Sequence, residues 1–216
     1  MRVIIAAGGE SERWNNYRNT PKHLVEIEGQ VLLNRTIKQF KKYTNDIILI
    51  AKDDRYIFKD IVVEKPLYGE WYDFGKLYSS NHLWSNNRTI IVFGDVYFTD
   101  EAVKKIVSNK DSYKFFIRRT GSKLTGKKNA EIFGIAFSSD MNSTIKTNIE
   151  HLINKAQIGP GTWQLYFYMH GINHIRQIGR QTKNSGHIEI NDWTDDFDYP
   201  QDLIKWERMR LKFGAQ

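Results

Sequence analysis

The stretch Arg2-Val3-Ile4-Ile5-Ala6-Ala7-Gly8-Gly9 opens the sequence and decides how the rest of it is interpreted. A short apolar run that stops at two glycines is typical of a buried parallel strand followed by a tight loop. Paired glycines let the backbone approach a ligand closely and present N–H groups to phosphate oxygens. In open α/β sheets, ligands bind beyond the carboxyl ends of the strands, where this loop is expected.

Similar apolar runs alternate with amphipathic segments along the chain. Strands are predicted at residues 47–51, 61–63, 89–93, 113–117, 132–137, 174–178 and 187–190. Helices are predicted at residues 32–40, 75–84, 99–106, 163–170 and 203–211. Alternation of this kind favours right-handed crossovers with helices on both faces of a sheet. We therefore expect one α/β domain over residues 1–216: a three-layer α/β/α sandwich with a mostly parallel mixed sheet.

Composition excludes several classes of protein. The 6 Trp, 11 Tyr and 12 Phe residues are too many for a disordered chain. The sequence has 0 Cys, which excludes disulfides, thiolate catalysis and cysteine-bound zinc. No apolar run approaches the roughly 20 residues of a membrane span, and the first run is too short for a signal peptide. We expect a cytoplasmic protein that does not enter a membrane.

The charge balance narrows the class of partner. Lys and Arg number 32 against 25 Asp and Glu, a net charge of +7 that favours anionic partners. The basic residues are scattered among acidic ones, which argues against a nucleic-acid-binding arm. A phosphorylated small molecule and a plain solvated basic surface both remain open at this point.

The residues after the first loop carry a specific resemblance. Arg13 follows the glycines, and then come Pro21-Lys22-His23-Leu24 and, from residue 32, Leu-Leu-Asn-Arg-Thr. This pattern resembles the nucleotidyltransferases with a GT-A-like, Rossmann-related fold, which include the sugar-phosphate, CMP-sugar and molybdenum-cofactor enzymes. Ser11 stands where that family usually has glycine.

The resemblance implies roles for this loop. Backbone around the loop would hold the nucleotide, through Ala6, Ala7, Gly8, Gly9, Glu10 and Ser11. Arg13 and Lys22 would be the catalytic cations that grip the triphosphate. Glu10 and Glu12 are less expected beside a polyanion and would point outward.

Two acidic motifs suggest a metal site. Asp95 follows the predicted strand at residues 89–93, and the C-terminal region reads Asp195-Asp196-Phe197-Asp198-Tyr199-Pro200-Gln201-Asp202-Leu203. A carboxylate at a strand's end is placed to hold a divalent cation against phosphates. By the resemblance, Asp95 and Asp198 would bind Mg²⁺, with Asp196 as the rival second ligand. Asp202 is interpreted as a residue at a helix start.

Further candidates rest on looser matches. Lys76 and Ser79 lie in a segment that resembles the family's base- or ribose-binding stretch, and an ordinary core helix explains it equally well. Arg118 and Arg119 are candidates for the acceptor's phosphate, with a solvated surface pair as the alternative. Lys183 lies in a polar stretch that suits either a lid over phosphates or a plain loop.

The resemblance implies a Mg²⁺-dependent transfer of NMP from an NTP, with CTP favoured, to a small phosphomonoester such as a sugar phosphate. Pyrophosphate would be released, as in surface-polysaccharide precursor synthesis. Residues 1–100 would form the nucleotide-binding half and residues 110–216 the acceptor-binding half, in a monomer or a homodimer. Two alternatives remain: a GT-A glycosyltransferase, although Asp95-Val96-Tyr97 lacks that class's second Asp, and a non-catalytic nucleotide- or nucleic-acid-binding protein.

Overall fold

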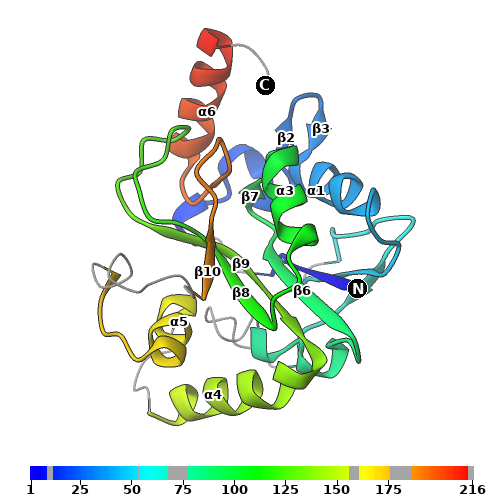
Figure 1. Ribbon diagram of the computed structural model, residues 1–216. Helices are drawn as coiled ribbons and strands as arrows, with labels where there is room; N and C mark the ends of the chain where they lie inside the picture. Colours follow the sequence, from blue (N-terminus) through cyan, green and yellow to red (C-terminus); the bar gives the residue numbers. More distant parts are fainter. Residues whose placement is uncertain (9–11, 53, 68–76, 156–160, 176–185, 214–216) are drawn as a thin grey trace.

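A seven-stranded mixed sheet forms the centre of the protein, seen in a computed structural model (Figure 1). The structure describes residues 1–8, 12–52, 54–67, 77–155, 161–175 and 186–213. The strands of the sheet are β1 (Arg2–Ala6), β4 (Ile47–Ile50), β5 (Val62–Glu64), β6 (Arg88–Phe93), β8 (Tyr113–Arg118), β9 (Glu131–Ser138) and β10 (His187–Glu189). The main helices are α1 (Leu32–Lys41), α3 (Asp100–Ser108), α4 (Asn142–Lys155), α5 (Thr162–His170) and α6 (Pro200–Phe213).

The order of strands across the sheet is β10-β8-β9-β6-β1-β4-β5. Strand β1 lies between β4 and β6 and is parallel to both, and β4–β5 and β8–β10 are also parallel pairs. Strand β9 is antiparallel to both of its neighbours, β6 and β8. The predicted mostly parallel mixed sheet is therefore confirmed.

Helices cover both faces of the sheet, as predicted. Val3 and Ile5 of β1 pack into the same cluster as Leu33 of α1 and Val103 of α3. Ile4, on the opposite face, packs with residues of α4 and α5. Figure 1 shows α1 and α3 on one side of the sheet and α4 and α5 on the other. This arrangement is the three-layer α/β/α sandwich.

Two short ribbons and α6 lie beyond the sheet. Strands β2 (Glu26–Ile27) and β3 (Gln30–Val31) form one antiparallel ribbon, and β7 (Val96–Tyr97) and β11 (Asp195–Asp196) form the other. A third cluster of buried side chains, which includes Trp206 and Phe197, packs α6 against the second ribbon. The C-terminal segment is thereby held against the end of β6.

Close backbone approach fixes glycine at two positions. A Cβ on Gly134 of β9 would lie 2.4 Å from the Ile91 carbonyl oxygen of β6. A Cβ on Gly94, which follows β6, would lie 2.9 Å from Ala7 Cβ. Both distances are too short for ordinary contacts. Glycine at position 94 therefore lets β6 end directly beside the end of β1.

Several predicted elements are confirmed and some differ. Thr99 caps α3 as expected, since its hydroxyl accepts a hydrogen bond from Ala102 N at 3.0 Å. Residues 174–175 are not in a strand, and the rest of that predicted strand lies outside the described residues. The predicted helix at 75–84 also begins outside them, and residues 81–83 form a 3-10 turn. Among the described residues, no helix combines the length and apolar content of a membrane span.

Candidate active site

The first part of the site lies where β1 and β6 end side by side. Ala6 pairs with Phe93, and Gly94 N donates a hydrogen bond to Ala6 O at 2.8 Å. Ala7 is fully buried, and Gly8 is buried after it. The expected ligand residues Gly9, Glu10 and Ser11 lie outside the described residues.

The ribbon of β7 and β11 brings the two acidic motifs together. Asp95 immediately precedes β7, and Val96 pairs with Asp196 of β11. Phe197 N donates to Asp95 O at 3.0 Å, so the chain on both sides of Phe197 lies against Asp95. Two motifs about a hundred residues apart in sequence thus meet beyond the end of β6.

Lys22 links the two predicted metal ligands. Its side chain is 9% exposed, and its Nζ lies 2.5 Å from Asp95 Oδ2 and 3.4 Å from Asp198 Oδ1. Burial lowers the pKa of Lys22, but the Asp95 and Asp198 carboxylates outweigh burial and raise that pKa above its ordinary value. The ammonium is therefore a permanent cation held between the two carboxylates.

Arg13 reaches the same carboxylate from the solvent side. Its NH1 lies 3.1 Å from Asp198 Oδ2, and its guanidinium lies 5.5 Å from the centre of the Tyr199 ring. The Arg13 side chain is 60% exposed and lines the cleft. Arg13 is placed to meet an incoming anion.

Glu131 joins Asp196 and Asp198 in an acidic trio that sequence analysis did not find. Oxygen atoms of the three carboxylates lie within 4.8 Å of one another. Burial, against the opposing charge of Lys127, raises the pKa of Glu131 to about 7. Burial and the nearby Glu131 raise the pKa of Asp196 well above its ordinary value. Burial is the first cause of both shifts, and it favours the protonated form of Glu131 and Asp196 although Lys127 lies beside them.

Lys127 forms ion pairs with two carboxylates of this trio and with Asp202. Its Nζ lies 2.8 Å from Asp196 Oδ2, 3.6 Å from Asp198 Oδ2 and 3.2 Å from Asp202 Oδ2. Asp202 Oδ2 also accepts hydrogen bonds from the backbone N–H groups of Asp198 and Tyr199, both at 3.0 Å. Asp202 therefore stands at the start of α6, as expected, and fixes the backbone that carries Asp198.

A cleft of about 130 Å³ opens over these groups. Its polar lining comprises Arg13, Lys22, Asp95, Glu131, Thr162, Asp196 and Asp198. Trp163, at the start of α5, and three apolar side chains complete the wall: Phe93, Val96 and Ile132. The cleft is thus lined by cations, carboxylates and an indole.

Of the remaining predicted residues, those that the structure describes do not line this cleft. Arg118 is buried, and its NH1 donates to Asp195 Oδ1 at 2.5 Å, with both side chains at most 1% exposed. Arg119 pairs with Glu189 on the exposed side of β10. Ser79 is fully buried. Lys76 and Lys183 lie outside the described residues. The structure thus gives Arg118 an internal ion pair rather than an open position.

Comparison with known proteins addresses the fold. No protein-family profile and no curated protein matches the sequence. A solved structure from Bacillus anthracis, assigned as a glucose-1-phosphate thymidylyltransferase, matches at 14% identity and TM-score 0.66, covering 100% of this chain and 97% of that one. The CTP:phosphocholine cytidylyltransferase of Streptococcus pneumoniae matches at 16% identity and TM-score 0.63, covering 96% and 98%.

A third structure, the inositol-1-phosphate CTP transferase of T. maritima, matches at 13% identity and TM-score 0.59, covering 100% and 97%. These identities are low, so the matches bear on the fold, and they run through nearly the whole length of each chain. The protein therefore has the nucleotidyltransferase-like fold that its first hundred residues predicted.

Proposed function

We propose that this protein is a Mg²⁺-dependent nucleotidyltransferase. It moves the NMP group of an NTP onto a small phosphomonoester such as a sugar phosphate and releases pyrophosphate. CTP is the favoured nucleotide, a preference supported by the names of two of the three similar structures. Residues 1–100 form the nucleotide side and residues 110–216 the acceptor side.

The observation that carries this proposal is the meeting of Lys22, Asp95 and Asp198 at the ends of β1 and β6. Lys22 Nζ contacts both carboxylates. The glycine-containing loop that follows β1 begins beside Asp95. In an α/β sheet this edge is the usual place for a nucleotide. A fixed ammonium beside paired carboxylates suits phosphoryl chemistry, where neutralising charge is the main task.

The carboxylates at this edge fit a hard divalent cation. Asp196 Oδ1 is buried and has no hydrogen-bond partner among the described residues. Carboxylate oxygens are the ligands that Mg²⁺ prefers, and oxygen atoms of Glu131, Asp196 and Asp198 lie within 4.8 Å of one another. Asp95 and Asp198 would hold the ion, with Asp196 and Glu131 beside them. When bound, Mg²⁺ would neutralise charge that develops on the phosphates.

The protein's own groups position the reactants. An oxygen of the acceptor phosphate attacks the α-phosphorus of the NTP, the bond between the α-phosphorus and the bridging oxygen breaks, and pyrophosphate leaves with that oxygen. Lys22 and Arg13 offset the charge of the β- and γ-phosphates as they depart. No covalent bond to the protein is required.

The acceptor side is built by β9, α5 and the segment after β11. Trp163 and Thr162 bring the start of α5 to the cleft that Lys22 and Asp95 also line. An indole offers a flat apolar face against which the body of an acceptor can lie. Glu131 offers a carboxylate for hydroxyl groups of the acceptor or for the metal.

The test is pyrophosphate release from each of the four NTPs, offered with a panel of sugar, polyol and amino-alcohol phosphates. We expect one nucleotide and one acceptor class to give turnover that requires Mg²⁺ and stops with EDTA. Absence of release from every pair, in protein shown to be folded, would overturn the proposal.

Asp95→Asn supplies the matched variant. A neutral amide is a poorer ligand for a hard cation, so we expect kcat to fall at least about 100-fold. Asp111→Asn, on a carboxylate that hydrogen-bonds Asn109 at the surface, is the control and should change kcat little. Near-normal turnover by Asp95→Asn would remove Asp95 from the metal site.

A further inference from the structure

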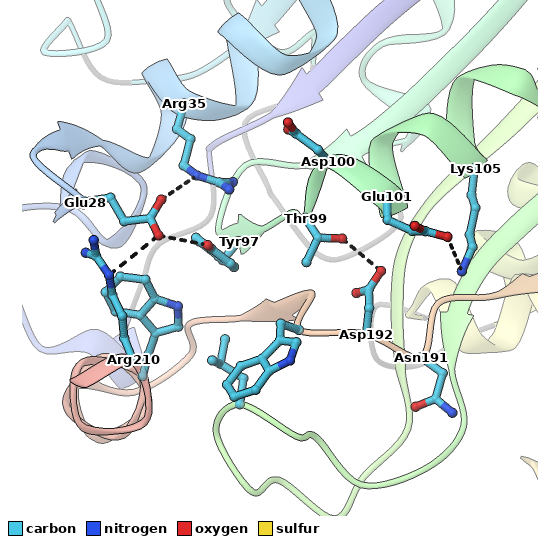
Figure 2. A pocket seen from close by; sticks show the side chains of 13 residues that line it. Glu28, Arg35, Tyr97, Thr99, Asp100, Glu101, Lys105, Asn191, Asp192 and Arg210 are labelled. Atoms are coloured by element: carbon cyan, nitrogen blue, oxygen red, sulfur yellow. Dashed lines mark hydrogen bonds and ion pairs between the residues drawn. The ribbon is translucent and has the colours of Figure 1, made fainter. Parts of the chain in front are cut away.

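A second cavity, of about 540 Å³, lies beside the β7–β11 ribbon. Seven segments of the chain build it: the β2–β3 turn, α1, β7, α3 with its cap Thr99, the loop between β8 and β9, the chain before β11, and α6. Figure 2 shows their side chains around the cavity. Among the described residues, it shares no lining residue with the catalytic cleft. Its volume falls in the range of small-molecule sites, roughly 300–1,000 Å³. The reaction proposed above makes no use of it.

The cavity has an aromatic and apolar lining. Tyr97, Leu124 and Trp206 line it and are themselves buried, and Trp193 is partly buried. The Tyr97 ring lies 5.3 Å from the Trp206 ring, and the guanidinium of Arg35 lies 4.1 Å from the centre of the Tyr97 ring. These contacts hold the Tyr97 ring in place, so this part of the cavity is preformed.

Polar side chains of the walls hold one another in place, as the dashed lines of Figure 2 show. Glu28 accepts a hydrogen bond from Arg35 Nε at 3.2 Å and one from the Tyr97 hydroxyl at 3.1 Å, and it lies 3.8 Å from Arg210. On the opposite wall, the Thr99 hydroxyl donates to Asp192 Oδ2 at 2.8 Å. Oriented donors and acceptors therefore surround the opening.

The charges of these walls nearly balance. Four carboxylates and three cations line the cavity: Glu28, Asp100, Glu101, Asp192, Arg35, Lys105 and Arg210. Each already has a partner within the protein. Lys105 lies 3.6 Å from Glu101, and Asp100 lies 3.0 Å from Lys42. Asp192 accepts its hydrogen bonds from the neutral Thr99 hydroxyl and Thr194 N, so the lining carries a slight excess of negative charge that disfavours a polyanion.

We propose that this cavity is a second ligand site, for a neutral polyhydroxylated molecule such as a saccharide or a polyol. Hydroxyl groups both donate and accept, which matches walls of mixed carboxylate, guanidinium, amide and hydroxyl groups. The C–H faces of such a molecule suit the indole of Trp193. Nucleotides and sugar phosphates bind the catalytic cleft instead, where the cations Arg13 and Lys22 lie.

A ligand in this cavity would contact the β7–β11 ribbon, which also carries Asp196 and is flanked by Asp95 and Asp198. Tyr97 pairs with Asp195, and Trp193 lies two residues before Asp195. Thr99 N also donates to the Thr194 hydroxyl at 3.1 Å. A ligand that contacts Tyr97 and Trp193 therefore links β7 to the segment that leads into β11. A ligand that binds the folded state and not the unfolded one raises the melting temperature.

Calorimetric titration of the whole chain tests the site, with glucose, maltose and ribitol as neutral probes and inorganic phosphate and CMP as charged ones. We expect at least one neutral probe to bind at one site and to raise the melting temperature. Trp193→Ala should weaken that binding about tenfold or more, since an aromatic contact and its buried area are lost. Trp163→Ala, in the catalytic cleft, should leave it within about twofold.

Three outcomes would overturn the proposal: no neutral probe binds, Trp163→Ala rather than Trp193→Ala removes the binding, or Trp193→Ala removes only phosphate or CMP binding. The melting temperature of each unliganded variant shows whether it is folded. Should Trp193→Ala be unfolded, Trp193→Phe keeps a ring at the position and should bind the neutral probe more weakly than the wild type. Wild-type affinity in a folded Trp193→Phe would then count against the site. These outcomes are independent of whether NTPs are turned over.

Discussion

The buried ammonium of Lys22 gives a prediction at the scale of single residues. Lys22→Met removes the buried ammonium between Asp95 and Asp198, while Asp198 keeps its contacts with Arg13 and Lys127. We expect the free energy of unfolding to fall by about 3 kcal/mol. Added MgCl₂ should restore part of this loss, because a divalent cation can take over the same carboxylates. Urea unfolding with and without MgCl₂ measures both effects.

Lys41→Met is the control for this change. Lys41 Nζ lies 3.6 Å from an Asp60 side chain that is 70% exposed, and such pairs contribute at most about 1 kcal/mol. If Lys22→Met were no less stable than Lys41→Met, the contact between Lys22 and the two carboxylates would not contribute to the free energy of unfolding.

At the scale of elements, α5 is anchored to β10 by a buried tyrosine–histidine pair. The Tyr166 hydroxyl lies 2.8 Å from His187 Nδ1, and this contact fixes the helix whose first residues line the cleft. Burial, and then the positive charge of Arg119, lowers the pKa of His187 from 6.5 to about 4. The folded protein therefore keeps this ring neutral at a pH where the unfolded chain protonates it.

The sign of the pH effect follows from that lowered pKa. Above pH 6.5 the neutral His187 makes its full contribution to the free energy of unfolding. As the pH falls from 6.5 toward 4, this contribution is lost, and the loss is on the order of 3 kcal/mol. His187→Gln should remove this part of the acid sensitivity, whereas His82→Gln, on an exposed side chain, should not. Unfolding free energies measured from pH 7 to pH 4 check this, and parallel curves for wild type and His187→Gln would contradict it.

At the scale of the whole molecule, β9 joins the two parallel parts of the sheet. A Cβ at Gly134 would lie 2.4 Å from the Ile91 carbonyl oxygen, so Gly134→Ala must separate β9 from β6. We expect global stability to fall by about 2 kcal/mol or more. Gly171→Ala, where φ is +61° and no atom lies within 4 Å of the added Cβ, should cost only about 1 kcal/mol. Equal losses in urea unfolding would show that the sheet adjusts freely at Gly134.

The parts of this molecule that the sequence predicted are those with a local signal. Buried strands such as β1 and β6 appear as apolar runs, and Asp95 follows one of them directly. The helix α4 was not predicted, although its apolar residues Ile145, Ile149 and Leu152 recur at helical spacing and pack into one cluster.

The acidic trio depended on tertiary structure that no local pattern encodes. Strands β7 and β11 are two residues each, too short for any periodicity, yet their pairing places Asp196 and Asp198 beside Asp95. Glu131 and Lys127 come from a region without a recognisable motif. Nor does the sequence alone distinguish Arg118, which is buried against Asp195, from a surface arginine.

The β7–β11 ribbon also determines when, during synthesis of the chain, Lys22, Asp95 and Asp198 can come together. Lys22 and Asp198 are 176 positions apart in the chain. Lys22 is therefore synthesised early in translation, and its contact with Asp198 can form only when translation is nearly complete. Contacts of such sequence separation are slow to form. While the chain is still growing on the ribosome, β1, β4 and β6 can pair, but Lys22 has only Asp95. In a half-made chain the ends of β1 and β6 thus exist without Asp198, and the group of Lys22, Asp95 and Asp198 is complete only once the C-terminal segment has been made.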